Sequence, residues 1–169
     1  MASVRRLQQL APDQIDALAG VLIDCIEGGA SVSFMHPLSP QRAREFWQQV
    51  ADELPRGARA LLVAEDDVGI VGTVQLLLAQ PENQPHRADL AKMLVHRRAR
   101  GQGIGAALLA AAEQLARDCG KTLLVLDTAS AQAERLYQRG GWQRCGTVPG
   151  YALLPQGGLC ATTFFYREL

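Results

Sequence analysis

The stretch that decides the fold spans residues 97–105 and reads Arg97-Arg98-Ala99-Arg100-Gly101-Gln102-Gly103-Ile104-Gly105. It follows the apolar run Met93-Leu94-Val95 and opens a helical pattern that ends near Cys119. Three glycines in five residues allow the backbone to approach a ligand closely and to turn its N–H groups inward. The start of the helix adds the positive end of its dipole, and the arginines add positive charge. Because a hydrophobic core needs no such combination, we interpret the stretch as a pyrophosphate-binding loop.

The same glycines also fit a dinucleotide-binding motif. Gly101, Gly103 and Ala106 satisfy G-x-G-x-x-G/A, and Asp127 ends an apolar run where a ribose-binding acid would be expected. However, residues 96–100 separate the strand from the first glycine, some 90 residues precede the motif, and only 42 follow Asp127. An NADP-type oxidoreductase module is therefore the weaker alternative. A Walker loop is excluded because no Gly-Lys-Ser/Thr follows the glycines.

These residues resemble the GNAT superfamily of acyl-CoA-dependent N-acetyltransferases. The pyrophosphate loop of that family, Q/R-x-x-G-x-G/A, is matched by Arg100, Gly103 and Gly105. A second family element is a strand followed by N-x-x-A-x-x-x-Y and Gly-Phe. It is matched, with serine in place of asparagine, by residues 123–127, Ser130, Ala133, Tyr137 and Gly141-Trp142. The resemblance covers residues 60–145 well, and residues 28–31, 126–128 and 149–151 look similar to the tabtoxin-resistance acetyltransferases of that superfamily.

The resemblance implies an α/β fold of the GNAT type, in which a mixed, mostly antiparallel sheet carries helices on both faces. Hydrophobic patterning predicts the same order of elements. We expect strands at 4–9, 60–64, 70–79, 88–95, 123–126, 142–148 and 161–167, and helices from Pro12 to Gly28, from Pro40, at 104–119 and at 131–139. The resemblance further implies that acetyl-CoA is the co-substrate. Its expected contacts are Met93, Leu94, Val95, Arg98, Arg100, Gly101, Gln102, Gly103, Ile104, Gly105, Ala106, Ser130 and Ala133.

Acetyl transfer to an amine needs a proton acceptor, an oxyanion donor and a proton for the leaving thiolate. Tyr137 lies where the family places its general acid, and a phenol with a pKa near ~10 can protonate a thiolate. By resemblance, a backbone N–H near Leu94 serves the oxyanion. Asp89 and Asp127 are both candidate bases. Asp89 could instead pair with Arg87 or Lys92, Asp127 could cap a turn, and Tyr137 could be a packed aromatic residue.

The acceptor site is expected between the segment 30–38 and the loop 149–159, which border it in the family. Phe34, Met35, Tyr151 and Asp127 are the candidate contacts. Neither segment is strongly acidic, which disfavours polybasic acceptors and favours a small amine, such as a metabolite, an amino acid, or a toxin or antibiotic that the enzyme would inactivate. A non-catalytic acyl-CoA sensor is the second alternative, because it would need the glycine loop but neither Asp89 nor Tyr137.

The composition of the chain indicates which binding partners and which cellular compartment to expect. The chain has 169 residues, which suits a single domain over 1–169, and 17 basic residues balance 17 acidic ones, so neither nucleic acid nor a membrane is an expected partner. Locally, residues 87–100 carry five basic side chains against Asp89, as an anion site would. Four scattered cysteines predict neither a metal site nor disulfides. Without a signal segment, we expect a cytoplasmic protein, with a homodimer as one candidate state.

Overall fold

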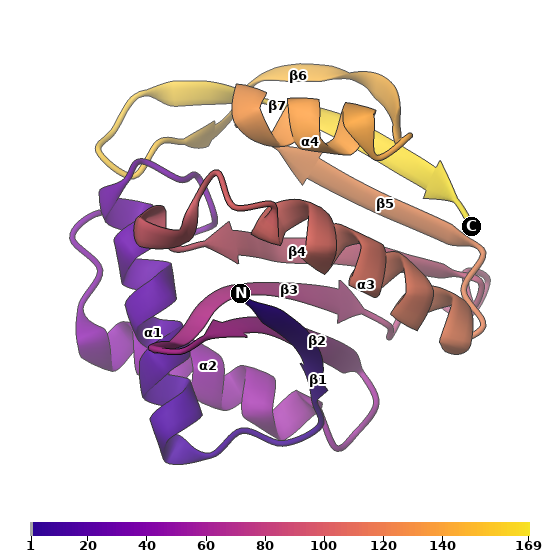
Figure 1. The fold of residues 1–169 in the computed structure, drawn as a ribbon. Coiled ribbons are helices and arrows are strands. Elements are labelled where there is room, and N and C mark those ends of the chain that lie inside the picture. Colours follow the sequence, from indigo (N-terminus) through magenta and orange to yellow (C-terminus); the bar gives the residue numbers. More distant parts are fainter. Residues whose placement is uncertain (1) are drawn as a thin grey trace.

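The computed structural model describes residues 2–169 and arranges them around one seven-stranded sheet (Figure 1). The strand order is β1-β2-β3-β4-β5-β7-β6, in which β4 and β5 are parallel and all other neighbours are antiparallel. The strands are β1 Ser3–Leu7, β2 Arg59–Asp66, β3 Gly69–Leu77, β4 Arg87–Val95, β5 Leu123–Thr128, β6 Gln143–Leu153 and β7 Leu159–Glu168. This is the mixed, mostly antiparallel sheet that the resemblance to the GNAT superfamily implies.

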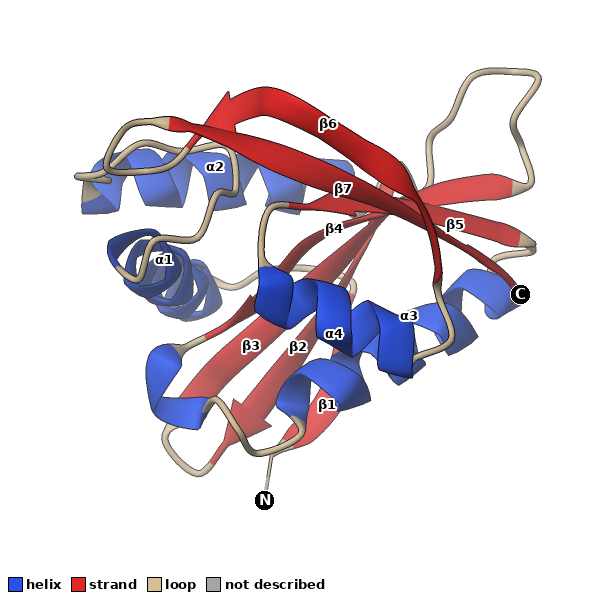
Figure 2. Cartoon of the chain, turned by 90° about the horizontal axis from the view of Figure 1, so that it is seen from above, coloured by secondary structure: helices blue, strands red, loops and turns tan. Residues whose placement is uncertain are grey.

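The helices cover both faces of the sheet, which Figure 2 shows from above. They are α1 Pro12–Glu27, α2 Pro40–Glu53, α3 Ile104–Asp118 and α4 Ala131–Arg139, with a 3₁₀ helix, η1, at Arg97–Ala99. The α1 and α2 helices enclose one core around Trp47 and Leu94, whereas α3 and α4 pack over a second core around Leu108 and Phe165. Within residues 2–169 no helix is long and apolar enough to cross a bilayer. The predicted GNAT fold is confirmed, and the doubly wound parallel sheet of an NADP-type module is absent from the described chain.

Helix boundaries follow local signals in the sequence. The α2 helix begins after Ser39, whose hydroxyl accepts a hydrogen bond from the Arg42 N–H at 3.2 Å. The α4 helix begins after Ser130, whose hydroxyl accepts the Ala133 N–H at 3.2 Å. The α3 helix begins after Gly103, which has a φ of +76° that a β-carbon would oppose. Each boundary lies within two residues of its predicted place because the capping chemistry is local.

The last hairpin differs from the prediction. The β6 strand continues through Pro149 and Gly150 to Leu153, so the loop expected over 149–159 shortens to residues 154–158. The pairing of β6 with β7 shifts register between Val148 and Ala152, which marks a bulge. Proline and glycine are tolerated at a bulge in an edge strand, and β6 is an edge strand. The Pro149-Gly150 pair, a pattern that normally indicates a loop, therefore lies within a strand.

The two parallel strands separate halfway along their length. The pairing of β4 with β5 covers only Arg87–Asp89 and Leu123–Val125. On its other side β4 is bulged, because Gln75 of β3 pairs with Ala91 while Thr73 pairs with Leu94. The second half of β4 therefore turns away from β5, and the opening faces the loop before α3.

Candidate active site

A cavity of about 660 Å³ lies where β4 and β5 separate. Its walls come from the second half of β4, the loop before α3, the end of β5, α4, and the end of α1 with the loop that follows it. Most of the predicted cofactor contacts line it, namely Met93, Leu94, Val95, Arg100, Gly101, Gly103, Ile104, Gly105, Ala106, Ser130 and Ala133. Two predicted catalytic residues, Asp127 and Tyr137, line the same cavity.

The loop at one end of the cavity has the geometry of a diphosphate cradle. Gly101 and Gly103 both have a φ of +76°, and no atom outside their immediate neighbours lies within 4 Å of where a β-carbon would be. The first N–H groups of α3 have no acceptor inside the helix and carry the positive end of its dipole. Beyond Asp89, the β4 backbone is not paired with β5 and can bind extended amides as an added strand would. These residues fit acetyl-CoA.

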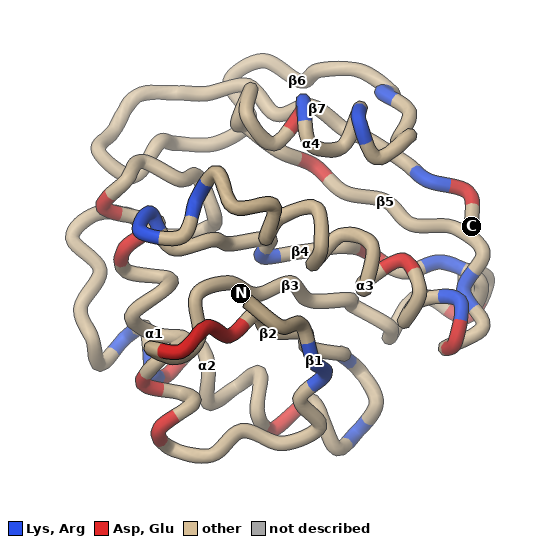
Figure 3. Tube along the Cα trace, viewed as in Figure 1, with Lys and Arg blue, Asp and Glu red and all other residues tan. Residues whose placement is uncertain are grey.

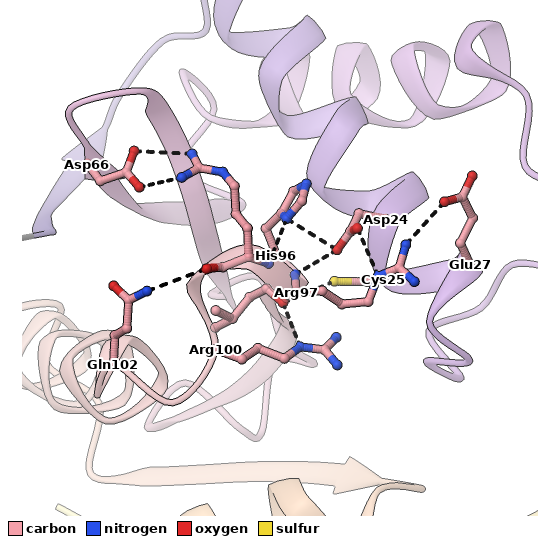
Figure 4. Close-up of polar contacts among 10 residues, drawn as sticks. Asp24, Cys25, Glu27, Asp66, His96, Arg97, Arg100 and Gln102 are labelled. Atoms are coloured by element: carbon pink, nitrogen blue, oxygen red, sulfur yellow. Dashed lines mark hydrogen bonds and ion pairs between the residues drawn. The ribbon is translucent and has the colours of Figure 1, made fainter.

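The arginines before the loop divide into two groups (Figure 4). The Arg97 backbone N–H and Nε donate to Asp24 at 2.8 and 2.9 Å, and Arg97 Nη2 donates to Glu27. Arg98 makes two hydrogen bonds to Asp66, at 2.6 and 3.1 Å, and lowers the pKa of that carboxyl to about 2. Neither arginine lines the cavity. This differs from the prediction that Arg98 contacts the cofactor, because its guanidinium is occupied by the β2–β3 turn.

Arg100 is the arginine of this loop that lines the cavity, with its Nε donating to the Val95 carbonyl at 3.1 Å. Gln102, a second predicted contact, does not line the cavity; its amide donates to the Arg98 carbonyl at 3.4 Å. The ion pairs of Arg97 and Arg98 tie the loop to α1 and to the β2–β3 turn. Their charges therefore position the loop, while its ligand-facing charge comes from Arg100.

Figure 3 shows that both signs of charge are interspersed over much of the trace, whereas residues 145–166 of the β6–β7 hairpin carry neither. Of the five basic side chains predicted to form an anion site at residues 87–100, three form ion pairs with carboxylates, namely Arg87, Arg97 and Arg98. Lys92 and Arg100 have no carboxylate within 4.0 Å in residues 2–169, and both line the cavity. Of the five positive charges at residues 87–100, those of Lys92 and Arg100 are therefore available to a ligand in the cavity.

Tyr137 is held rigidly at the cavity wall. Its side chain is 4% exposed and its ring packs against Trp142 and Phe165, with centroids 5.8 and 5.9 Å apart. Burial, aided by the negative charge of Asp127, raises the pKa of Tyr137 well above its ordinary value. The hydroxyl therefore carries its proton at neutral pH, as a general acid must before the leaving group departs.

The two candidate bases have different surroundings. Asp127 lines the cavity, and one of its carboxylate oxygens accepts a hydrogen bond from the Thr162 hydroxyl at 2.9 Å. Asp89 does not line the cavity; it pairs with Arg87, which Gln80 and Gln84 also hold. The structure brings Asp127, rather than Asp89, together with Tyr137.

Of the four predicted acceptor contacts, Asp127 lines the cavity, whereas the other three lie outside it. Phe34 packs edge-on against Phe46, with centroids 5.4 Å apart, and Tyr151 packs in the same way against Phe164 at 5.8 Å. Met35 is 47% exposed. These three side chains are absent from the cavity wall, where the segment after α1 and the β6–β7 turn instead contribute Ala30, Ser31, Val32 and Leu154.

Sequence reasoning missed Lys92 as a residue of the cavity wall. Its Nζ donates to the Ser33 hydroxyl at 3.1 Å and lies 5.7 Å from the centroid of the Phe46 ring. Its φ of +51° lies in the left-handed region, which costs about 1–2 kcal/mol for a residue with a β-carbon. The available signal was a lysine inside an otherwise apolar stretch of strand. No group of three or more His, Cys, Asp or Glu side chains in residues 2–169 is arranged to bind a metal ion.

The sheet order and the loop between β4 and α3 place this chain in the class of acyl-CoA N-acyltransferase folds. The chain belongs to the acetyltransferase (GNAT) family, whose model matches residues 29–142.

Solved structures share the fold over nearly the whole chain. A ribosomal-protein-alanine N-acetyltransferase from Brucella melitensis is 24% identical, with a TM-score of 0.81 over 99% of both chains. A phosphinothricin acetyltransferase from Sinorhizobium meliloti, in complex with acetyl-CoA, is 18% identical, with a TM-score of 0.82 over 99% of this chain and 88% of its own. Human N-acetyltransferase 8B is 40% identical over 87 residues, a match that spans 50% of this chain and 38% of the human protein.

Proposed function

We propose that this protein is an acetyl-CoA-dependent N-acetyltransferase that transfers acetyl directly to the amine of a small molecule in a ternary complex. One observation carries the proposal above all. A single cavity joins the glycine loop, which fits a diphosphate, to a buried tyrosine and a carboxylate that fit the transfer chemistry. Membership of the acetyltransferase family supports it.

The residues of the cavity have complementary roles in the proposed reaction. When bound, acetyl-CoA supplies an acetyl group activated as a thioester, which passes to the acceptor nitrogen as the C–N bond forms and the C–S bond breaks. Asp127 accepts a proton from the acceptor ammonium, leaving the neutral amine as the nucleophile. The Tyr137 hydroxyl gives its proton to the departing sulfur, and the second proton lost by the nitrogen returns through solvent to the phenolate. One proton is released overall.

The transition state also needs a donor for the carbonyl oxygen as it becomes negative. The β4 backbone near Leu94 suits this role because β4 is not paired with β5 there. Asp89, which pairs with Arg87 away from the cavity, is not assigned a catalytic role in this scheme.

A small acceptor fits the cavity better than a polybasic one, because Asp127 is the one acidic residue among the described residues that line it. The similarity of residues 28–31, 126–128 and 149–151 to tabtoxin-resistance acetyltransferases supports a toxin, an antibiotic or a related metabolite as the acceptor class. The fold shared with a phosphinothricin acetyltransferase is in keeping with this class. The free cysteines, of which Cys145 is exposed, suit a cytoplasmic location.

Two measurements test the proposal. Calorimetry should detect binding of acetyl-CoA and none of NADPH. A panel of small amines and peptides, incubated with acetyl-CoA, should then reveal acceptors through the release of CoA thiol. Tight binding of acetyl-CoA without turnover on any amine would identify a sensor instead, and binding of NADPH alone would overturn the proposal.

A further inference from the structure

We infer that the acceptor is an amino acid, an amine that carries its own carboxylate, with Asp127 receiving its ammonium end and Lys92 its anionic end. The inference rests on the proposed function and names the substrate class of the same cavity. It starts from a lysine that the transfer chemistry does not use.

The bulge in β4 places Lys92 in the cavity. Because Gln75 pairs with Ala91 and Thr73 pairs with Leu94, Lys92 and Met93 together oppose a single residue of β3. An extra residue of this kind redirects the side chains of a strand. Lys92 turns toward Ser33 and Phe46 on the α1–α2 side of the sheet and lines the cavity there.

Both residues of the Lys92–Ser33 contact have an unfavourable backbone conformation. Lys92, with a φ of +51°, and Ser33, with a φ of +79°, are the two residues other than glycine with positive φ in residues 2–169. These two residues hydrogen bond one another through their side chains. Glycine would adopt either conformation without strain. Strained residues that persist at a ligand cavity are typical of positions whose side chains have a function.

Lys92 lacks the counter-charge that a partly buried cation needs. Burial and the positive charge of Arg59 lower the pKa of Lys92, and Asp127 opposes this shift. Arg59 is itself engaged by Glu53 and Gln75. In residues 2–169 the polar partner of the Lys92 ammonium is the Ser33 hydroxyl, and no carboxylate lies within 4.0 Å. A carboxylate on the acceptor would supply the missing charge.

The opposite charge faces the same cavity from the neighbouring strand. Asp127 has one carboxylate oxygen bonded to Thr162, and its other oxygen remains to receive an ammonium group. An amino acid presents both an ammonium and a carboxylate and so matches the pair. A simple amine would bring a second positive charge toward Lys92 without compensation, so the pair selects against it.

The test compares acceptors that differ only in the carboxylate. L-Amino acids are assayed beside their carboxamides and their decarboxylated amines, with β- and γ-amino acids to measure the spacing of the two charges. Loss of one charge-assisted contact predicts kcat/KM about 100-fold higher for the amino acid than for its carboxamide. Lys92→Gln should lower kcat/KM far more for amino acids than for carboxamides and so remove most of this preference. Lys92→Arg should restore part of it.

Controls separate this inference from a general defect. Arg56→Gln makes the same change in net charge at an exposed residue and should keep the full preference. Thermal melting and calorimetry with acetyl-CoA establish that each variant folds and binds the co-substrate. Titration of amino acids into the CoA-loaded protein gives a readout that does not need turnover, and Lys92→Gln should weaken that binding but not the binding of carboxamides.

The outcomes distinguish the two proposals. If wild-type protein acetylates carboxamides or simple amines as well as amino acids, the proposed function stands and the amino-acid inference is overturned. Equal losses on all acceptors in Lys92→Gln would also overturn it, because Lys92 would then serve structure or proton transfer. Lys92-dependent binding of amino acids without acetylation would retain the inference and reject the proposed catalysis.

Discussion

Replacement of Tyr137 by phenylalanine removes the hydroxyl that donates a proton in the proposed reaction and keeps the packing of the ring. The ring contacts with Trp142 and Phe165 are apolar and persist in phenylalanine, and the hydroxyl has no hydrogen-bond partner in residues 2–169. We therefore expect the free energy of unfolding to change by less than about 1 kcal/mol. The loss of a general acid should lower kcat by about 10²-fold, equivalent to ~2.7 kcal/mol of transition-state stabilisation. The affinity for acetyl-CoA should change little, because the proton moves only as the sulfur departs.

The assay is the release of CoA thiol at saturating acetyl-CoA, with single-turnover measurements to establish that chemistry limits the rate. The raised pKa of Tyr137 adds a pH criterion. An acid whose pKa is raised stays protonated as pH increases, so in the wild type no alkaline decline from this group should occur below about pH 10. Unchanged single-turnover rates in Tyr137→Phe would refute the reasoning and return the residue to a packing role. So would a wild-type rate that falls between pH 7 and 9 and becomes flat in the variant.

Three further predictions concern the loop, the base and the pairing of the loop with α1. Gly103→Val, which places a β-branched residue at a φ of +76°, should weaken acetyl-CoA binding at least about tenfold in calorimetry, and retained affinity would contradict the cradle. Asp127→Asn should lower kcat/KM at pH 7 and lose less at high pH, where free amine is abundant, whereas Asp89→Asn should be nearly silent; the reverse pattern would assign the base to Asp89. Burial opposes ionisation of Asp24, but hydrogen bonds from Arg97 and the charge of His96 outweigh it and lower its pKa. The ionised carboxylate stabilises the fold above its unfolded pKa of about 4, and this stabilisation is lost as pH falls below that value. Asp24→Asn should therefore lower the melting temperature at pH 7, and the melting temperatures of variant and wild type should converge in acid.

The elements were predictable because their signals are local. Ser39 and Ser130 cap the helices they precede, and the glycines at 101 and 103 adopt the positive φ that the loop interpretation requires. The helix predicted at residues 131–139 has those bounds in the structure. Signals of this kind act within a few residues, so tertiary packing rarely overrides them. The position of Tyr137 at the cavity was predicted from its match to the tyrosine of the family element that follows the strand.

The partners of charged side chains were not predictable. Arg97 bonds to a carboxylate 73 residues away and Arg98 to one 32 residues away. Sequence shows the sign of these side chains but not which distant acid folding will bring beside them. The expectation of free positive charge therefore held for Arg100 and not for Arg98. The partner of the Ser130 side chain was likewise not predicted. Its hydroxyl caps α4, although the residue lines the cavity as expected of a cofactor contact.

The bulge in β4 had the largest consequence of the features that sequence could not reveal. Before the bulge, even-numbered side chains such as Leu90 belong to the core under α3. After the bulge, odd-numbered side chains such as Met93 face that core, and Leu94 belongs to the core under α1 and α2. A shift of one residue exchanges the faces of every later side chain in a strand. The bulge lies just beyond the point where β4 leaves β5, and it turns Lys92 toward Ser33 at the cavity wall. The backbone edge proposed to bind acetyl-CoA and the cation proposed to select the acceptor thus depend on one irregularity, so a change that regularises β4 should impair both together.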